Sequence, residues 1–401
     1  MTTVSKSISK RLAKAMVAMV ALSLAVAGLG GTAGAGGKVT GEPVKIGVIT
    51  SVGVSGIDLP TLEEGAQAAA EYVTKELGGI AGRPVEAIVC NDKSDPAQDA
   101  VCAQKFIDEG VIAITGLGPT WGDNGLPITA AANIPFVGLP ISNAEFINPS
   151  SYPMTGGSAS AFPALAKYFL DKGVKKAAII YADLAAGKLA ADALLGDPLI
   201  AGGVEVVAIP EKVGAPDFTP AVVQANAGDP DVIFMLFSGP DCVRILQAAG
   251  QVGVNASMAG AGSCVEEKTF DEVDDSIVDG AIFNSDTAYF VKNDPEAKTY
   301  RKALKKYEKA APSGFSATTF ATIMTLKTIG DELGDGLSAQ AVLDTLKNAD
   351  GIPVFLAQPM NKADAATLAG VPINIYNPWQ RIVRLKNGKV VDANDNEWIR
   401  G

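Results

Sequence analysis

The sequence predicts an α/β protein of two lobes, each a doubly wound parallel sheet, joined by three crossovers around a ligand cleft. The chain has 401 residues, more than one hydrophobic core usually supports, so two domains are expected. Apolar strand-like segments alternate with helix-like segments, and this alternation starts again after the turn-rich residues 148–160. Strands that are apolar throughout are covered on both faces, which indicates parallel strands between helices.

The first 35 residues have the pattern of a secretory signal peptide. Four basic residues and no acid precede the apolar run "AMVAMVALSLAVAGLG", and Ala33 and Ala35 form an A-x-A cleavage site. A retained anchor helix is the alternative, but the run is short for a membrane span and ends in glycines. No cysteine follows it for lipid attachment. We therefore expect an exported protein of the periplasm or cell exterior.

Composition excludes several classes of function. The formal net charge is −11, and it becomes more negative once the basic leader is removed, so nucleic acid and anionic lipid are poor partners. The chain contains no histidine, which excludes Ser-His-Asp and Cys-His catalysis and makes zinc sites improbable. The acidic runs at 266–268 and 271–275 are typical of solvated faces. We expect no catalytic residues and no metal.

A nucleotide cofactor is also not expected. The segment "GLGPTWG" at 116–122 comes nearest to a dinucleotide fingerprint, but Trp121 stands in place of its third glycine. No acid ends the following strand to bind a ribose. The chain also has no G-x-x-x-x-G-K-[ST] phosphate loop.

Four cysteines at 90, 102, 242 and 264 could serve a metal, a redox pair or disulfides. Their spacing fits neither the C-x(2-4)-C of a zinc site nor the C-x-x-C of a redox pair. Because an exported protein meets an oxidising environment, disulfides are expected. Three connectivities are possible, and we predict the two local pairs, Cys90 with Cys102 and Cys242 with Cys264.

In the first half, β-branched apolar runs predict strands and apolar residues at helical spacing predict helices. The helix that begins near Leu62 has a glycine stop at Gly78 and Gly79. The expected strands are 44–50, 85–90, 111–116 and 134–139, and the expected helices are 62–79 and 96–110.

The second half repeats this pattern and ends in a β-hairpin with its turn at Asn387 and Gly388. The expected strands are 176–182, 204–210, 231–238, 256–262 and 280–290. The expected helices are 161–173, 187–203, 240–253, 295–311, 316–333 and 338–349. Ligands of open parallel sheets bind beyond the carboxyl ends of the strands, so both predicted disulfides would fix loops on the ligand side.

Several segments, in this order and spacing, resemble the leucine/isoleucine/valine-type substrate-binding proteins of ABC importers. The likeness covers about residues 43–350 and weakens beyond them. The segments are "VKIGVITSVGVSG", "GGIAGRPVEAIVCNDKSDPAQDAVCAQKFIDEGVIAITG", "IPFVGLPISNAEF", "AAIIYADLAAG" and "FSGPDCVRILQAAGQVG".

The resemblance implies a type I periplasmic-binding-protein fold that captures a small molecule between its lobes by hinge closure. It implies crossovers near 153–158, 286–291 and 350–356. Lobe 1 would comprise 36–155 with 288–349, and lobe 2 would comprise 156–287 with 350–401. The protein would be a non-enzymatic monomer without cofactor, and it would deliver its ligand to an ABC permease, its sole contact with the membrane.

The resemblance also implies that hydroxyls and amides of lobe 1 bind a ligand carboxylate. The matching loops offer Thr120 beside Trp121, and Ser142 with the backbone around Ile141. A small hydroxyl beside helix-start amides suits an anion. The alternative is that Thr120 and Ser142 only cap their helices.

Lobe 2 departs from the family pattern. Ala186 and Ser238 stand where the family shows tyrosines, and Ala261 stands near the acid that holds a ligand ammonium. A buried ammonium needs a partner, so either another acid substitutes or the ligand lacks an ammonium. The candidate acids are Asp183, Asp241, Glu266 and Asp286. The aromatic residues that could line an apolar pocket, or only pack in the core or hinge, are Trp121, Phe237, Tyr289 and Phe290.

Two other functions stay open at this stage. The same fold could serve as a ligand-sensing receptor that acts on a signalling partner. A secreted hydrolase or lyase that uses Asp and Ser is the enzymatic alternative, and no motif in the sequence favours it.

Overall fold

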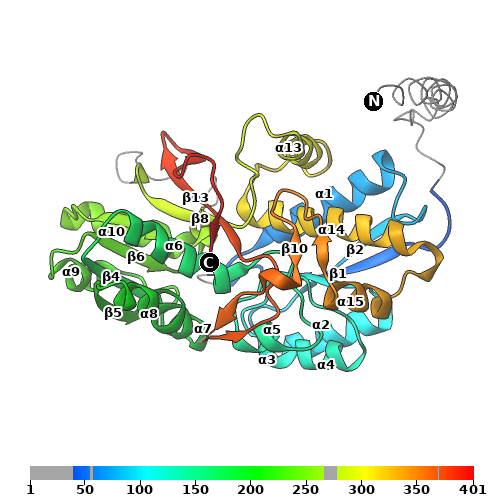
Figure 1. The fold of residues 1–401 in the computed structure, drawn as a ribbon, viewed down its shortest axis with the longest axis horizontal. Helices are drawn as coiled ribbons and strands as arrows, with labels where there is room; N and C mark the ends of the chain where they lie inside the picture. The colour runs from blue at the N-terminus through cyan, green and yellow to red at the C-terminus, as the bar shows by residue number, and fades with distance from the viewer. Residues whose placement is uncertain (1–38, 55–56, 266–277, 369) are drawn as a thin grey trace, which may run out of the picture. The chain divides into compact units, whose positions relative to one another are not determined.

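The computed structural model describes residues 39–54, 57–265, 278–368 and 370–401, which belong to one compact unit of the chain (Figure 1). The predicted signal peptide 1–35 and Glu266 lie outside the described residues. No helix within the described ranges is long and apolar enough to cross a membrane.

The first sheet has three parallel strands in the order β2-β1-β3. The predicted strand 134–139 lies beside β3, where the amide of Val137 donates to the carbonyl of Ile114 (2.8 Å). It forms only isolated bridges at Phe136, because β3 is three residues long and offers a short edge. The strands are β1 (Val44–Thr50), β2 (Val85–Asn91) and β3 (Ile114–Gly116).

Helices from both ends of the chain cover this sheet. Helices α13 and α14 pack against α1, so the chain returns to the first sheet after it has built the parallel strands of the second. The sequence did not predict the short helices α3, α4 and α5. The helices are α1 (Pro60–Glu76), α2 (Pro96–Glu109), α3 (Trp121–Asn124), α4 (Leu126–Ala131), α5 (Asn143–Ile147), α13 (Pro295–Tyr307), α14 (Gly314–Leu333) and α15 (Ala339–Lys347).

The second sheet is mixed, with the order β14-β13-β8-β7-β6-β4-β5. Strands β4 to β8 are parallel, as predicted, while the predicted C-terminal hairpin adds antiparallel to β8. Its turn residues Asn387 and Gly388 both have positive φ, of 50° and 66°. The strands are β4 (Lys176–Ala182), β5 (Glu205–Glu211), β6 (Val232–Leu236), β7 (Ser257–Gly260), β8 (Ile282–Ser285), β13 (Trp379–Lys386), β14 (Lys389–Asp392) and β15 (Ile399–Arg400).

The predicted helix 187–203 is not one regular helix. It divides into α7 (Ala185–Leu189), a π-helical turn (Ala190–Gly196) and α8 (Asp197–Ala201). Pro198 has no N–H to donate to the preceding turn, which accounts for the irregularity before it. The other helices on this sheet are α6 (Gly157–Asp171), α9 (Thr219–Asn226) and α10 (Gly239–Val252). The short strands near the C-terminus are β9 (Asp350–Ile352), β10 (Met360–Asn361), β11 (Thr367–Leu368) and β12 (Val371–Pro372).

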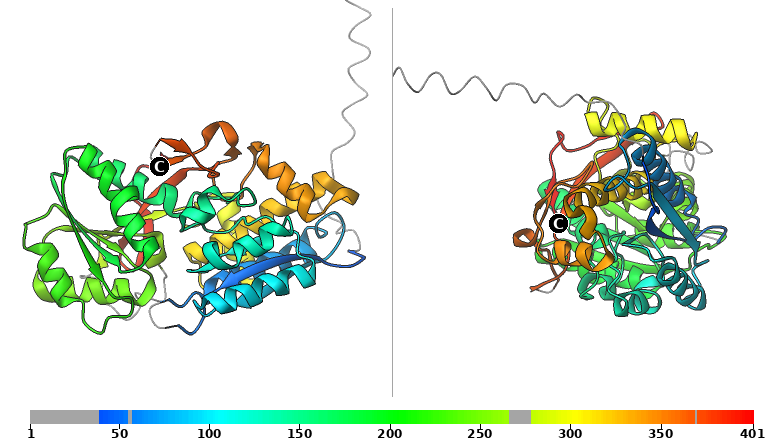
Figure 2. Two further views of the ribbon diagram at one scale, coloured as in Figure 1. Left: turned by 90° about the horizontal axis from the view of Figure 1, so that it is seen from below. Right: turned by 90° about the vertical axis from the view of Figure 1, so that its right-hand side faces the viewer.

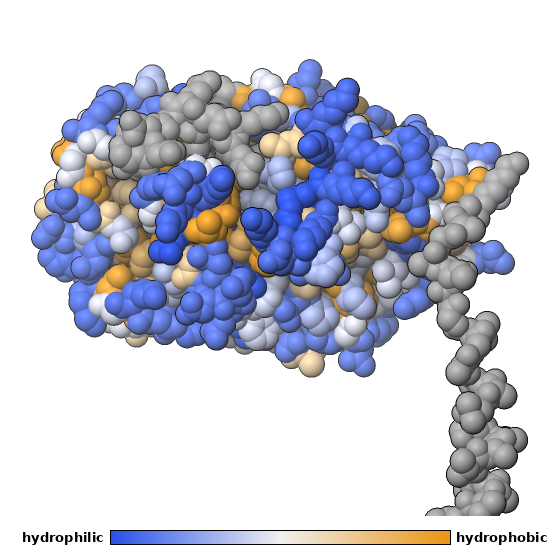
Figure 3. Space-filling model, turned by 90° about the horizontal axis from the view of Figure 1, so that it is seen from above, coloured by the Kyte–Doolittle hydropathy of each residue, from blue (hydrophilic) through white to orange (hydrophobic). Residues whose placement is uncertain are grey.

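Both faces of the central strands β4 and β6 of the second sheet are buried, as their apolar sequences predict, whereas most residues of the edge strand β5 are partly or fully exposed. Successive residues of β4 face opposite sides, and Ile179 and Ile180 therefore belong to separate apolar clusters. Figure 2 shows helices on either side of the green strands. Hydrophilic residues predominate on the face drawn in Figure 3, and apolar surface shows near its middle and in smaller patches toward its edges.

The chain passes between the two sheets three times among the described residues. It crosses before α6, between β8 and α13, and between α15 and β13. The segment of the third passage contributes to both cores, with Val354 and Met360 in that of the first sheet and Ile373 in that of the second. The lobe boundaries given above stay a prediction.

Gly65 lets α1 and α14 approach closely, because a Cβ there would collide with the backbone of Ser316. We expect Gly65→Ala to lower the free energy of unfolding by about 1–3 kcal/mol, despite the higher helix propensity of alanine. Gly228→Ala is the matched control, since a Cβ at Gly228 meets no atom within 4 Å. Urea denaturation measures both, and equal midpoints for the two variants would contradict this packing.

Candidate functional site

A cavity of about 750 Å³ lies at the carboxyl ends of the parallel strands of both sheets. The segment that follows each of the strands β1 to β8 contributes to its wall. Ser94 follows β2, Thr120 follows β3, Ala186 follows β4, and Ala261 follows β7. The cavity is thus where the topology predicts a ligand.

Most of the residues predicted for the site line this cavity. They are Thr120, Ile141, Ser142, Ala186, Ser238, Ala261 and Tyr289.

Trp121 and Asp183 do not line the cavity. Trp121 is fully buried and packs edge-on against Phe106, with ring centroids 6.0 Å apart. Its position in α3 turns the ring into the core of the first lobe. Trp121 therefore packs in the core and does not line the ligand cavity. Asp183 is exposed, and its amide donates to the carbonyl of Glu211 (2.9 Å). Phe237 lines the cavity, whereas Phe290 does not.

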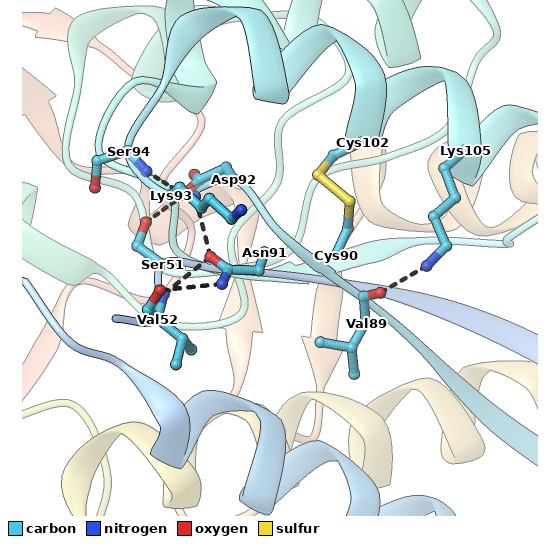
Figure 4. Close-up of a disulfide and its surroundings, with 10 residues drawn as sticks. All are labelled: Ser51, Val52, Val89, Cys90, Asn91, Asp92, Lys93, Ser94, Cys102 and Lys105. Atoms are coloured by element: carbon cyan, nitrogen blue, oxygen red, sulfur yellow. Dashed lines mark hydrogen bonds between the residues drawn. A yellow bond between two sulfur atoms is a disulfide. The ribbon is translucent and has the colours of Figure 1, made fainter. Parts of the chain in front are cut away.

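The structure confirms both predicted disulfides. Cys90 at the end of β2 joins Cys102 on α2, and Cys242 on α10 joins Cys264, with Cα atoms 5.6 Å apart in each pair. Figure 4 shows the first disulfide beside the loop that carries Asp92 and Ser94. Both bonds hold loops at the cavity edge, because Ser94 and Ser263 contribute to its wall.

Buried carboxyls connect the strand-end loops of the first sheet. The hydroxyl of Ser51 and the amide of Ser94 donate to Oδ1 of Asp92 (Figure 4). Thr120 donates its hydroxyl to Oδ2 of Asp99 (2.5 Å). Burial raises the pKa of Asp99 to about 7, the Thr120 hydroxyl opposes this, and the neighbouring Asp92 raises it further.

Ser142 begins α5 with a capping box. Its hydroxyl accepts from the amide of Glu145 (3.3 Å), and Oε2 of Glu145 accepts from the amides of Ser142 (2.9 Å) and Ile141 (2.7 Å). Glu145 is fully buried, and burial raises the pKa of this carboxyl to about 7 although both amides lower it. The amides predicted to bind a ligand carboxylate therefore already bind a carboxyl of the chain itself.

Two candidate acids of the second lobe differ in how they are partnered. Asp241 is fully buried, pairs with Arg244, and accepts from the amide of Gly214 (2.8 Å). Asp286 is half-buried on the cavity wall. The amide of Gly157 (3.0 Å) and the side chain of Gln380 (2.7 Å) both donate to its Oδ1. Burial raises the pKa of Asp286, and these two donors oppose the rise.

Sequence reasoning missed Asp99, Glu145 and Gln380. The pair Ser142 and Glu145 has the S-x-x-E spacing of a capping box, a signal that was available. No sequence motif points to Gln380, because its contact with Asp286 joins segments that lie 94 residues apart. No group of three or more His, Cys, Asp or Glu that could hold a metal occurs among the described residues.

Comparison with known proteins identifies the family. Residues 43–371 match the sequence profile described as periplasmic binding protein. The chain belongs to this family. A Leu/Ile/Val-binding protein, BraC3 of Rhizobium johnstonii, is 24% identical over 340 residues, which cover 83% of this chain and 88% of that protein.

Solved structures share the fold of this periplasmic binding protein. The branched-chain amino acid binding protein LivJ of Streptococcus pneumoniae, in complex with isoleucine, has a TM-score of 0.71 at 17% identity, covering 90% of this chain and 100% of that one. A solute-binding protein of an ABC transporter from R. palustris, in complex with benzoate, has a TM-score of 0.71 at 18% identity, covering 88% and 96%. The predicted family and fold are therefore confirmed.

Loss of the first disulfide should destabilise the protein. Replacing both Cys90 and Cys102 by Ala should lower the free energy of unfolding by about 3 kcal/mol, because the closed loop restricts the unfolded chain. Urea denaturation without reductant measures the loss, and the Cys242→Ala, Cys264→Ala variant provides a second loop for comparison. An unchanged midpoint in the first variant would contradict a stabilising role for this bond.

Glu145 should make stability fall as pH rises. Folding raises the pKa of Glu145 from 4.5 to about 7, so the folded state keeps its proton over a range in which the unfolded state has lost it. The free energy of unfolding should therefore decrease across this range by up to about 3 kcal/mol.

Glu145→Gln tests this pH dependence. Glutamine keeps an acceptor oxygen for the two amides and has no titrating proton, so the variant should lose less stability between about pH 5 and about pH 8. Urea denaturation at both pH values gives the difference, and Glu86→Gln at an exposed position of β2 serves as the control. Parallel losses in the wild type and Glu145→Gln would contradict the assignment.

Proposed function

We propose that this protein is an exported solute-binding component of an ABC importer. It captures a small organic molecule in the cavity between its lobes and delivers it to a membrane permease, without catalysis. The observation that carries the proposal is the cavity itself, whose wall combines the segments that follow the parallel strands of both sheets. Membership of the periplasmic binding protein family supports the same conclusion.

Capture depends on residues of both lobes. Thr120 and Ser142 from the first lobe and Ser238 and Ala261 from the second would contact the same molecule, which therefore stabilises the closed arrangement of the lobes. The three passages of the chain between the sheets would act as the hinge. Export and a monomeric state are part of this proposal.

Solute-binding proteins of this fold hold chemically different ligands. The names of the compared structures record isoleucine in one and benzoate in another. Ala186, Ser238 and Ala261 replace the two tyrosines and the acid that the amino acid binders show at these positions. These replacements favour a different ligand for this chain. We therefore propose a small organic solute, and an amino acid is one member of the set to be tested.

A thermal-shift screen of the protein without its leader, with disulfides intact, tests capture. The panel comprises amino acids, amides, amines, short-chain and aromatic carboxylates, and sugars. A solute at 100 times its dissociation constant should add about 2.7 kcal/mol of stability, and small-angle scattering should then show a smaller radius of gyration. If no class of solute raises the melting temperature, the proposed function is wrong.

A further inference from the structure

We propose that the cavity selects a solute with an apolar body and a polar head that donates hydrogen bonds, such as an amide, an alcohol or an amine, and that it disfavours a carboxylate. The inference rests on the proposed function and specifies its ligand. The hydrogen bonds on the cavity wall carry it, because they determine whether the wall offers donors or acceptors to a ligand.

Glu145 occupies two backbone donors on the wall of the first lobe. The amides of Ile141 and Ser142 both point to its Oε2, at 2.7 and 2.9 Å, and the Ser142 hydroxyl also donates to this atom (3.1 Å). A ligand carboxylate could bind these amides only after displacing a fully buried side chain. Such a displacement leaves a carboxyl without partners in the protein interior, which is costly.

Five other wall hydroxyls also donate inward. A hydroxyl has one proton, so once it donates to the protein it offers a ligand only its lone pairs. Thr120 donates to Asp99 (2.5 Å), Ser158 to the carbonyl of Pro140 (3.2 Å), and Ser263 to the carbonyl of Phe237 (2.9 Å). Ser285 and Thr318 donate to backbone carbonyls in the same way. This part of the wall is therefore an array of acceptors.

The charged residues on the wall also favour a hydrogen-bond donor over a carboxylate. Three acids, Asp123, Asp241 and Asp286, line the cavity, whereas the described wall residues include no Lys or Arg. Arg244 neutralises Asp241. At Asp286 the hydrogen bonds from Gly157 and Gln380 both end on Oδ1, and hydrogen bonds from Thr155 and from its own backbone also favour the charged form of this carboxyl. A ligand N–H or ammonium would be attracted to Asp286, while a ligand carboxylate would be repelled.

The rest of the wall is mainly apolar. Residues from both lobes contribute, among them Leu117, Leu139, Phe162, Phe237 and Phe315. The volume of about 750 Å³ is within the range of cavities that hold small organic ligands. An apolar body with a donor head thus matches both parts of the wall.

Matched sets of compounds test the inference in the wild-type protein. Each set places a carboxylate, an amide, an alcohol and an amine on one apolar body: benzoate, benzamide, benzyl alcohol and benzylamine, or hexanoate, hexanamide, hexanol and hexylamine. Thermal shift followed by calorimetry should show at least one donor-headed member binding at least about tenfold more tightly than its carboxylate. If the carboxylates bind most tightly, this inference is wrong and the proposed function stands. If no compound in these sets or in the broader screen binds, both are wrong.

Variants at Asp286 then locate the head group. Asp286→Asn should weaken binding of the tightest amine at least about tenfold and change binding of the neutral amide much less, because the charge is lost while a side-chain oxygen remains. Asp183→Asn removes the same charge from an exposed position off the cavity wall and should change neither. Thr120→Val supplies a second variant on the opposite lobe, in which donor-headed binding should also weaken. Undiminished binding of amine and amide in both Asp286→Asn and Thr120→Val would overturn the assigned head-group position.

Discussion

The buried carboxyl of Glu145 constrains the ligand side of the first lobe through three hydrogen bonds to its Oε2. It holds the amides of Ile141 and Ser142 and thereby fixes the start of α5 at the cavity wall. Asp99 fixes Thr120 in the adjacent loop through its hydroxyl. Because two buried acids supply the acceptors for these groups, the loops are held in place by the protein itself and do not depend on a ligand for their hydrogen bonds.

The disulfides place the same kind of constraint on the loops that face each other across the cavity. Cys90 and Cys102 frame the loop that contains Asp92 and Ser94, and Cys242 and Cys264 connect the start of α10 to the segment after β7. Preorganised loops lose less conformational entropy when a ligand binds, which favours affinity for a small solute. Hinge closure, as proposed, would then move two prearranged surfaces together.

Local patterns made much of the fold predictable from the sequence. The run "VKIGVIT" has the bounds of β1, and "KAAIIYA" has those of β4, because buried parallel strands require uninterrupted apolar residues. The three-residue length of β3 depends on packing between distant segments, whereas the irregular helix before Pro198 has a local cause that is visible in the sequence. In the candidate site, hydroxyls at strand ends were predictable from their loops. Their donor direction was not, because it depends on Asp99, which lies 21 residues before Thr120 and is buried by other elements.

A crystal structure of the protein bound to its tightest-binding solute would most directly test the claim that the cavity selects a donor head group. The account predicts that Oε2 of Glu145 still accepts from the amides of Ile141 and Ser142, and that a donor group of the solute lies within hydrogen-bond distance of Asp286 or of the Thr120 hydroxyl. A solute carboxylate on the amides of Ile141 and Ser142, with the Glu145 side chain moved away, would contradict it.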